Sequence, residues 1–458
     1  MKDRLKSLVT GKPADYLEIR VEESQVTRIV FRGKDLETLG QSINYGGNVR
    51  ALVNGGWGFV SFNSLDGLEA KVDLAIRQAA LIGAASKEKV RLADVPVVED
   101  VVRVEYARDP RSVSLEDKTN LFRGYNDIIL SWGGKIRSSN VNYTDKHTVL
   151  YFANSEGTYI EQEKLDLSGG VSAIATEGSN TQIGRVGFGS STDFGVAVGL
   201  EEKVREACKK AEALLAAPVI AGGEYTVICD RTLAGIFAHE AFGHLSEADS
   251  IAENEAMRET MKLGRKFGHD FLNIYDTGRD VGARGYLKYD DEGVATGKTP
   301  LIENGVLVGR LHSRESAAKM GEWPTGNARA IDYRFPPIVR MRNTCIAAGE
   351  ASFEDMLAGV PLGVYCVNSY GGETNGEMFT FSAGEAYMIR DGKVAEMVRD
   401  VNLTGNVFRT LANIDMVGKD FCPHEGPGGC GKNGQGPLPT SEWAPHVRIQ
   451  KVIIGGKK

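Results

Sequence analysis

Residues 135–178 have the sequence KIRSSNVNYTDKHTVLYFANSEGTYIEQEKLDLSGGVSAIATEG, and this stretch carries the clearest fold signal in the chain. Apolar and polar residues alternate along most of it, which is typical of β-strands that bury one face. Turn-forming residues at 154–157 interrupt the alternation. We therefore expect two long antiparallel strands joined by a hairpin, with further strand structure to about residue 198.

The same alternation occurs nearer the N-terminus, across residues 15–62, where Asn and Gly at 54–56 predict a second hairpin. Apolar residues recur at helical spacing over 66–85 and again over 114–132, so each of these stretches predicts a helix. Between the two helices, residues 93–113 are rich in Val, Pro, Asp and Arg without a clear period. That composition favours a linker.

An amphipathic helix is expected at 200–215, and the glycine pair at 222–223 marks the start of a larger, β-rich domain. The chain therefore predicts an α+β fold, in which an N-terminal helix-and-sheet region precedes this C-terminal domain. We divide it into three regions: an N-terminal α/β region (1–110), a middle antiparallel-sheet and helix region (111–220) and the C-terminal domain (221–458).

Composition excludes several classes of protein. The chain has 458 residues and a formal net charge of −7, so nucleic acid and anionic membranes are not expected as partners. No apolar run approaches the ~20 residues of a membrane-spanning helix, and no secretory signal is apparent. The six cysteines are scattered along the chain. We therefore expect a cytoplasmic protein with reduced thiols.

Two of the seven histidines fall in one hexapeptide, HEAFGH, at residues 239–244. The pattern has one residue more than the HExxH motif of zinc proteases. Residues four apart on an α-helix lie about 40° apart around the axis, whereas residues five apart lie about 140° apart. His239 and His244 can share a metal ion only if the backbone winds wider, as in a π-bulge, or if the helix ends between them. Gly243 lowers the cost of that departure, so we predict non-α geometry between Glu240 and His244.

Each residue type in the hexapeptide suits hydrolysis at a metal ion. Neutral imidazoles bind Zn²⁺, and a catalytic zinc takes three protein ligands and leaves one position for water, whose pKa falls toward ~7. Glu240 is placed to take the proton of that water as a general base and to deliver it to the leaving amine. His239 and His244 are therefore candidate ligands, although either histidine taken singly is more often a packed or solvated residue.

A third ligand has to come from outside the hexapeptide, and spacing leaves several candidates open. Glu247 and Asp249 follow the second histidine closely, and either could instead orient a ligand imidazole or remain a solvated carboxylate. The glycine-rich segment FCPHEGPGGCGKNGQG adds Cys422, His424 and Cys430. For Cys422 the alternative is a buried thiol, the commonest state of a free cysteine.

The hexapeptide is similar to the HExxxH motif of the TldD/PmbA family of zinc metallopeptidases. The resemblance covers the whole C-terminal domain and, more loosely, the N-terminal half. Further segments resemble TldD members in the same order, namely DDEGVATGKTPLIENGVLVG (290–309), PTGNAR (324–329), RMRNT (340–344), GGETNGEMFTFSAGEAYMIRDGKV (371–394) and CGKNGQG (430–436).

The resemblance implies a C-terminal metallopeptidase domain that binds Zn²⁺ through His239, His244 and Cys430, with Glu240 catalytic. The other family subunit, PmbA or TldE, typically lacks the motif, so this chain resembles the TldD type. The implied substrates are unfolded or flexible peptides, cut inside a chamber formed by two subunits. Because the chain is shorter than the TldD pattern, a homodimer and a heterodimer with a PmbA/TldE-type subunit both remain open.

Three functions are compatible with these residues. The first is a zinc-dependent peptidase. The second is a non-catalytic peptide-binding or scaffold subunit with a structural metal, which a fourth protein ligand would favour. The third is a metal hydrolase that acts on another amide or ester.

Overall fold

Long antiparallel strands build the N-terminal half of the molecule, as the alternation predicts. The computed structural model describes residues 1–423 and 426–455. Its first sheet has seven strands in the order β3-β2-β1-β5-β6-β4, and β7 also pairs with β6. The bounds are β1 Tyr16–Arg32, β2 Asp35–Val53, β3 Gly56–Phe62, β4 Glu99–Val102, β5 Ile136–Asn154, β6 Tyr159–Glu177 and β7 Asn180–Ser190.

Both predicted hairpins are present. β5 and β6 pair antiparallel as far as Ala153 and Tyr159, on either side of the expected turn at 154–157. The turn between β2 and β3 contains Asn54 and Gly55, whose φ angles are 47° and 73°. Positive φ at both central residues is what a tight two-residue hairpin turn requires, and Asn and Gly tolerate it best.

The linker predicted at 93–113 is only partly correct, because it contains β4. This strand pairs in parallel with β6 at the sheet edge. Four residues are too few for their alternation to stand out in the sequence. Through these pairings, strands from residues before and after 110 belong to one continuous sheet.

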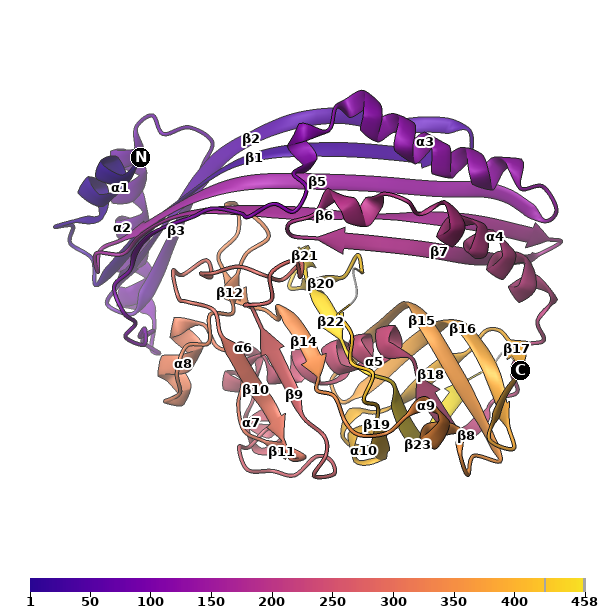
Figure 1. Cartoon of the computed structure of the whole chain (residues 1–458). Helices are drawn as coiled ribbons and strands as arrows, with labels where there is room; N and C mark the ends of the chain where they lie inside the picture. The colour runs from indigo at the N-terminus through magenta and orange to yellow at the C-terminus, as the bar shows by residue number, and fades with distance from the viewer. Residues whose placement is uncertain (424–425, 456–458) are drawn as a thin grey trace.

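Helices cover one face of this sheet. α3 (Leu115–Ser131) and α4 (Glu201–Ala216) share one apolar core with the long strands, while α1 (Lys2–Val9) and α2 (Leu68–Ala85) pack on a second core near the N-terminus. The uncovered face arches over the C-terminal half of the molecule (Figure 1). Polar and charged residues of this face, among them Glu22, Ser24 and Arg28 of β1, line a cavity against the C-terminal half.

The C-terminal half is β-rich, as predicted. One sheet has seven strands in the order β15-β8-β23-β18-β16-β17, with β19 on β23, and another has five in the order β11-β10-β9-β14-β22. Their bounds are β8 Gly223–Cys229, β9 Ile274–Thr277, β10 Lys298–Glu303, β11 Val306–Leu307, β14 Asn343–Ile346, β15 Leu362–Asn375, β16 Met378–Arg390, β17 Lys393–Val398, β18 Asn402–Asn406, β19 Ile414–Val417, β22 Ser441–Trp443 and β23 Val447–Gly455.

Two short ladders and six α-helices also belong to this half, over the residues that the structure describes. The ladders are β12 Ala328–Arg329 with β13 Ile338–Val339, and β20 Gly429–Lys432 with β21 Gln435–Pro439. The α-helices are α5 Arg231–Phe237, α6 Ala248–Ala252, α7 Glu255–Thr260, α8 Arg314–Met320, α9 Phe353–Leu357 and α10 Val407–Ala412. Among the described residues, no helix combines the length and the apolar character needed to cross a bilayer.

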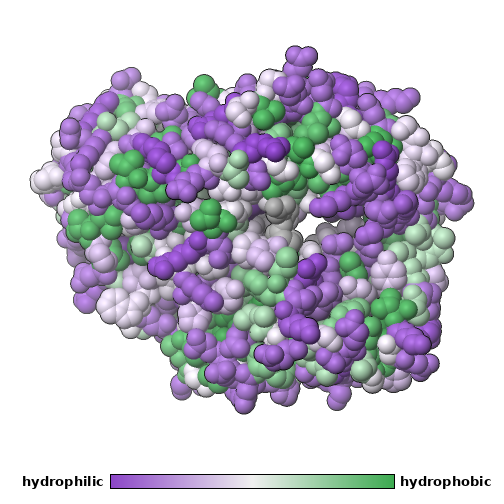
Figure 2. All heavy atoms as spheres, in the orientation of Figure 1, coloured by the Kyte–Doolittle hydropathy of each residue, from purple (hydrophilic) through white to green (hydrophobic). Residues whose placement is uncertain are grey.

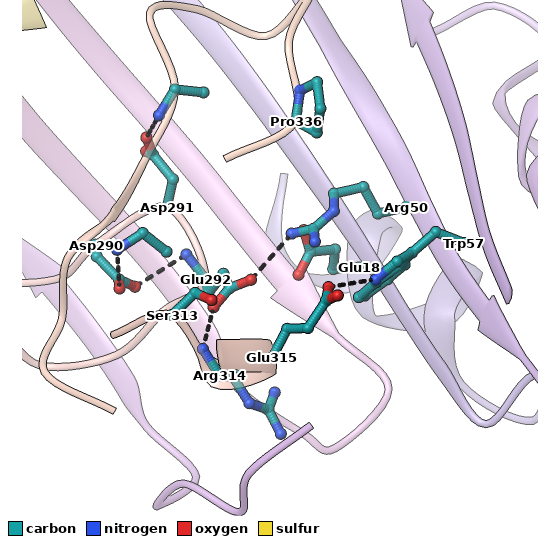
Figure 3. A network of polar contacts seen from close by, with 12 residues as sticks. Glu18, Arg50, Trp57, Asp290, Asp291, Glu292, Ser313, Arg314, Glu315 and Pro336 are labelled. Atoms are coloured by element: carbon teal, nitrogen blue, oxygen red, sulfur yellow. Dashed lines mark hydrogen bonds and ion pairs between the residues drawn. The ribbon is translucent and has the colours of Figure 1, made fainter. Parts of the chain in front are cut away.

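A buried network of ion pairs joins the two halves (Figure 3). Arg50 of β2 contacts Glu18 of β1 at 2.9 Å and Glu292 of the C-terminal half at 3.4 Å. Arg20 of β1 contacts Asp291 at 3.2 Å. All five side chains are less than one-tenth exposed, so the loss of one partner would leave a buried charge uncompensated. The network thus fixes the arching sheet against the C-terminal half, and the surface is hollowed between them (Figure 2).

At Gly184 of β7, the helix α4 lies directly against the sheet. A Cβ atom on Gly184 would lie 1.8 Å from the backbone oxygen of Ala207 in α4. Since the obstacle is backbone, the helix itself would have to move. Gly40 of β2 is different, because nothing lies within 4 Å of the corresponding position.

We expect Gly184→Ala to lower the free energy of unfolding by about 1–3 kcal/mol through overpacking. Gly40→Ala, the matched control, should stay within about 0.5 kcal/mol of the wild type. Chemical denaturation followed by circular dichroism measures both. Equal stability of the two variants would contradict the packing of α4 on β7.

Candidate metal centre

The hexapeptide winds as the spacing predicts. α5 passes into a π-helix at Ala238–Gly243, which is followed by a 3₁₀ turn at His244–Ser246. The backbone N–H of His244 donates to the carbonyl of His239, a bond that spans five residues. Because π winding returns residues five apart to the same face, the prediction of non-α geometry between Glu240 and His244 is confirmed.

Close packing holds this irregular segment in place. Asp230 caps α5 by accepting a backbone N–H of its first turn at 2.9 Å. A Cβ on Gly235 would lie 2.6 Å from the carbonyl oxygen of Glu442, and one on Gly243 would lie 1.9 Å from Sδ of buried Met341. The two glycines thus let the helix lie directly against β22 and against Met341.

The π-helix and a distant hairpin bring three potential ligands together. The imidazole centroids of His239 and His244 lie 5.4 Å apart, with their planes at 85°. Nε2 of His244 lies 3.3 Å from Sγ of Cys430 in β20. One ligand atom from each of the three side chains lies within 4.8 Å of the others. Two imidazoles and a thiolate at such distances could hold one Zn²⁺ ion and leave a position for water.

The structure places the other third-ligand candidates differently. Oε2 of Glu247 lies 3.0 Å from Nδ1 of His244, on the side of the ring away from Cys430. Asp249 accepts a hydrogen bond from Lys432 at 2.7 Å. Cys422 is exposed, so the alternative of a buried thiol is wrong for it. His424 lies outside the described residues.

Glu240 lies beside this cluster and partly open to solvent. Its Oε2 is 3.8 Å from Nε2 of His244, and its side chain is 21% exposed. Burial raises the pKa of Glu240, and the two neighbouring histidines oppose that shift. A carboxylate with a raised pKa, adjacent to potential ligands, is suited to accept and release a proton near neutral pH.

The charges of the cluster depend on one another. Burial alone would raise the pKa of Cys430, but His239 and His244 outweigh it and lower that pKa to about 5. Burial likewise opposes the charge on His239, yet Cys430 raises its pKa to about 9. Cys430 and Glu247 overcome the effect of burial on His244 and raise its pKa to about 10. The cluster therefore favours the thiolate of Cys430, the form that binds metals, while the two imidazoles hold protons that a metal ion would displace.

Three further residues shape the cluster, and sequence reasoning did not find them. Nζ of Lys432 lies 3.0 Å from Glu247, the residue that contacts His244. Arg340, which is fully buried, donates to the carbonyl of Cys430 at 2.5 Å. Glu442 lies 3.5 Å from Nδ1 of His239. Lys432 and Arg340 had a signal, because they lie in CGKNGQG and RMRNT, two of the segments that resemble the family, whereas Glu442 had none.

Three family models match the chain. They are the PmbA/TldA metallopeptidase domain 1 at residues 17–79, the central domain at 108–215 and the C-terminal domain at 222–456. A metalloprotease of Synechocystis is 46% identical over 444 residues, which cover 97% of this chain and 95% of the relative. A zinc metalloprotease TldD homolog of Saccharolobus solfataricus is 29% identical and covers 97% of each chain.

A solved structure has the same fold. TldE from Thermococcus kodakarensis superposes with a TM-score of 0.76 over the full length of both chains, at 20% identity. The fold and the sequence matches together define a metallopeptidase. Within that class, the chain belongs to the PmbA/TldA family, also called TldD/PmbA.

We expect Lys432→Met to loosen the β20–β21 hairpin, because the change removes the ion pairs that join this hairpin to buried Glu247 and to Asp249. Backbone amide exchange across Gly429–Pro439 should accelerate by more than about tenfold. Lys432→Arg, which keeps the charge, should restore much of the protection. Lys393→Met, at an exposed lysine of β17, is the matched control. Unchanged exchange in Lys432→Met would show that the lysine does not hold the hairpin.

Proposed function

We propose that this chain is a zinc-dependent peptidase in which His239, His244 and Cys430 bind the metal ion and Glu240 is the general base. The observation that supports this most strongly is the convergence of the three ligand atoms within 4.8 Å. Cys430 lies in a hairpin far along the chain from the two histidines. Its position beside them therefore comes from the tertiary fold and not from the spacing of residues on one helix.

The buried polar atoms of the cluster fit a metal ion. Both ring nitrogens of His239 are buried and have no hydrogen-bond partner among the described residues. An unsatisfied buried imidazole is costly, and a metal ion at one nitrogen would remove that cost. At His244, Glu247 accepts from Nδ1 and thereby leaves Nε2 free to bind toward Cys430.

The chain's own residues would divide the reaction as follows. A zinc ion, when bound, supplies Lewis-acid activation of water and of the scissile carbonyl. Glu240 accepts the proton from the attacking water and passes it to the departing amine nitrogen. Glu247 keeps the His244 ring in one tautomer and orientation, whereas Glu442 lies 3.5 Å from Nδ1 of His239 without a hydrogen bond to it.

For substrates, we propose unfolded or flexible peptides. The strand β20, which carries Cys430, lies beneath the arching sheet (Figure 1). A cavity of about 710 Å³ lies under the sheet, and its size suits an extended segment rather than a folded domain. As partner, we propose a second subunit, either another copy of this chain or a PmbA/TldE-type subunit. The shared fold with TldE supports a pairing of two similar chains.

We expect Glu240→Gln to lower kcat by at least about 10²–10⁴-fold, because the amide cannot accept the water's proton. Its zinc content, measured by atomic emission, should match that of the wild type. Glu259→Gln, whose side chain is 79% exposed in α7, should retain full activity on an unfolded protein substrate. Wild-type rates in Glu240→Gln would remove Glu240 from the mechanism.

Replacing the sulfur ligand tests the metal site itself. We expect Cys430→Ser to weaken zinc binding by more than the ~10–100-fold typical of changes behind the ligands, because a hydroxyl replaces the thiolate. Cys422→Ser, at the exposed cysteine, should bind zinc like the wild type. Competition with a fluorescent chelator gives both affinities. Equal affinities would exclude Cys430 as a ligand.

A further inference from the structure

A second feature of the molecule is a cavity of about 710 Å³ between the arching sheet and the C-terminal half. The polar face of the sheet forms its roof, through alternate residues of β1, β2, β5 and β6. Its opposite wall includes the loop 329–334 and the strand β21. Leu438 of that strand lines the cavity and pairs with Cys430 of β20, so one hairpin separates the cavity from the metal-ligand cluster.

The charges that line this cavity are unbalanced. Four carboxylates line it and pair with three arginines at 2.5–3.2 Å. Glu22 and Asp291 share Arg20, Asp166 pairs with Arg284, and Asp332 pairs with Arg334. Arg329 donates only to two backbone carbonyls. Arg28, Lys146 and Lys164 also line the cavity, and their side chains form no ion pair or hydrogen bond with any described residue. The unmatched charge in the cavity is therefore positive, although the whole chain carries −7.

The two lysines lie side by side on the roof. β5 and β6 pair so that Lys146 stands opposite Asp166 and Thr148 stands opposite Lys164, which makes the lysines diagonal neighbours. Both are only partly exposed. Burial and the nearby Lys164 lower the pKa of Lys146, and this lowering outweighs the opposite effect of Glu22, Asp332 and Asp166. An anionic group bound between them would relieve this repulsion.

We propose that the cavity binds an acidic stretch of the polypeptide substrate, with Lys146 and Lys164 pairing with its Asp or Glu carboxylates. This assignment rests on the proposed peptidase function and adds a substrate class to it. The cavity volume suits a short segment rather than a folded domain. Hydroxyl and amide side chains on the roof, at Ser24, Ser42 and Asn44, could bond the backbone of such a segment. The net negative charge of the chain disfavours long polyanions such as nucleic acid.

Binding can be measured without cleavage by placing every variant in the Glu240→Gln background. The probes are dye-labelled flexible peptides of equal length that carry four Glu, four Gln or four Lys residues. We expect the Glu peptide to bind at least about tenfold more tightly than the Gln peptide, and the Lys peptide to bind most weakly. The preference should fade at about 0.5 M salt, where screening shortens the reach of charge.

The double variant Lys146→Gln with Lys164→Gln should bind the Glu peptide no better than the Gln peptide. Lys34→Gln with Lys87→Gln, which removes two exposed lysines outside the cavity, should keep the preference. The double variant Lys146→Arg with Lys164→Arg keeps both charges and should also keep the preference for the Glu peptide. This control shows whether the glutamine variant loses the preference through its charge or through misfolding. Equal binding of all three peptides by the parent protein would overturn the proposal. So would a single-stranded oligonucleotide that displaces the Glu peptide and depends on the same two lysines.

Cleavage kinetics separate this proposal from the proposed function. With Glu240 intact, the double glutamine variant should show a raised KM for the Glu peptide and an unchanged kcat, because the lysines contact only a remote part of the substrate. Cleavage without any charge preference would overturn the cavity assignment alone. A charge preference in binding without any cleavage by the zinc-loaded wild type would overturn the peptidase function alone.

Discussion

Two imidazoles five residues apart on one helix can face a single ion only if the helix winds wider than an α-helix. The π-helix at Ala238–Gly243 meets that condition, and the surrounding packing maintains it. Gly235 lets α5 lie on β22, and Gly243 lies against Met341. Irregular winding loses regular hydrogen bonds, so it persists only where burial and close contact offset the cost.

Polar contacts hold the hairpin of Cys430 against the π-helix. Arg340 holds the carbonyl of Cys430, while Lys432 holds the carboxylate that orients His244. One short hairpin is thereby tied both to the potential ligands and to the residues behind them. The same hairpin forms part of a wall of the cavity under the arching sheet, so the candidate ligand Cys430 and that wall belong to one short element.

Much of the fold could be predicted from sequence because its signals are local. Alternation in residues 135–178 predicts β5 and β6, and Asn54 with Gly55 predicts the β2–β3 turn. The π-helix was predictable as well, since helix geometry follows directly from the spacing of two histidines. β4 was not, because a four-residue edge strand leaves too short a pattern.

The environment of the candidate site was harder to predict because its contacts join distant parts of the chain. Spacing alone could not separate Cys430 from Cys422 or His424, since all three lie in one glycine-rich segment without a period. Glu442 shows no motif at all, and its place beside His239 depends on how β22 packs on α5. The unpaired state of Lys146 likewise appears only once the carboxylates around it are seen to pair with arginines.

The most direct test of the metal centre is an anomalous-difference map, recorded at the zinc edge from crystals of the zinc-loaded protein. We expect one peak within about 2.0–2.3 Å of an imidazole nitrogen of His239, one of His244 and Sγ of Cys430, with solvent at the remaining position. A fourth protein ligand, or a peak out of reach of any of these three side chains, would contradict the hydrolytic centre.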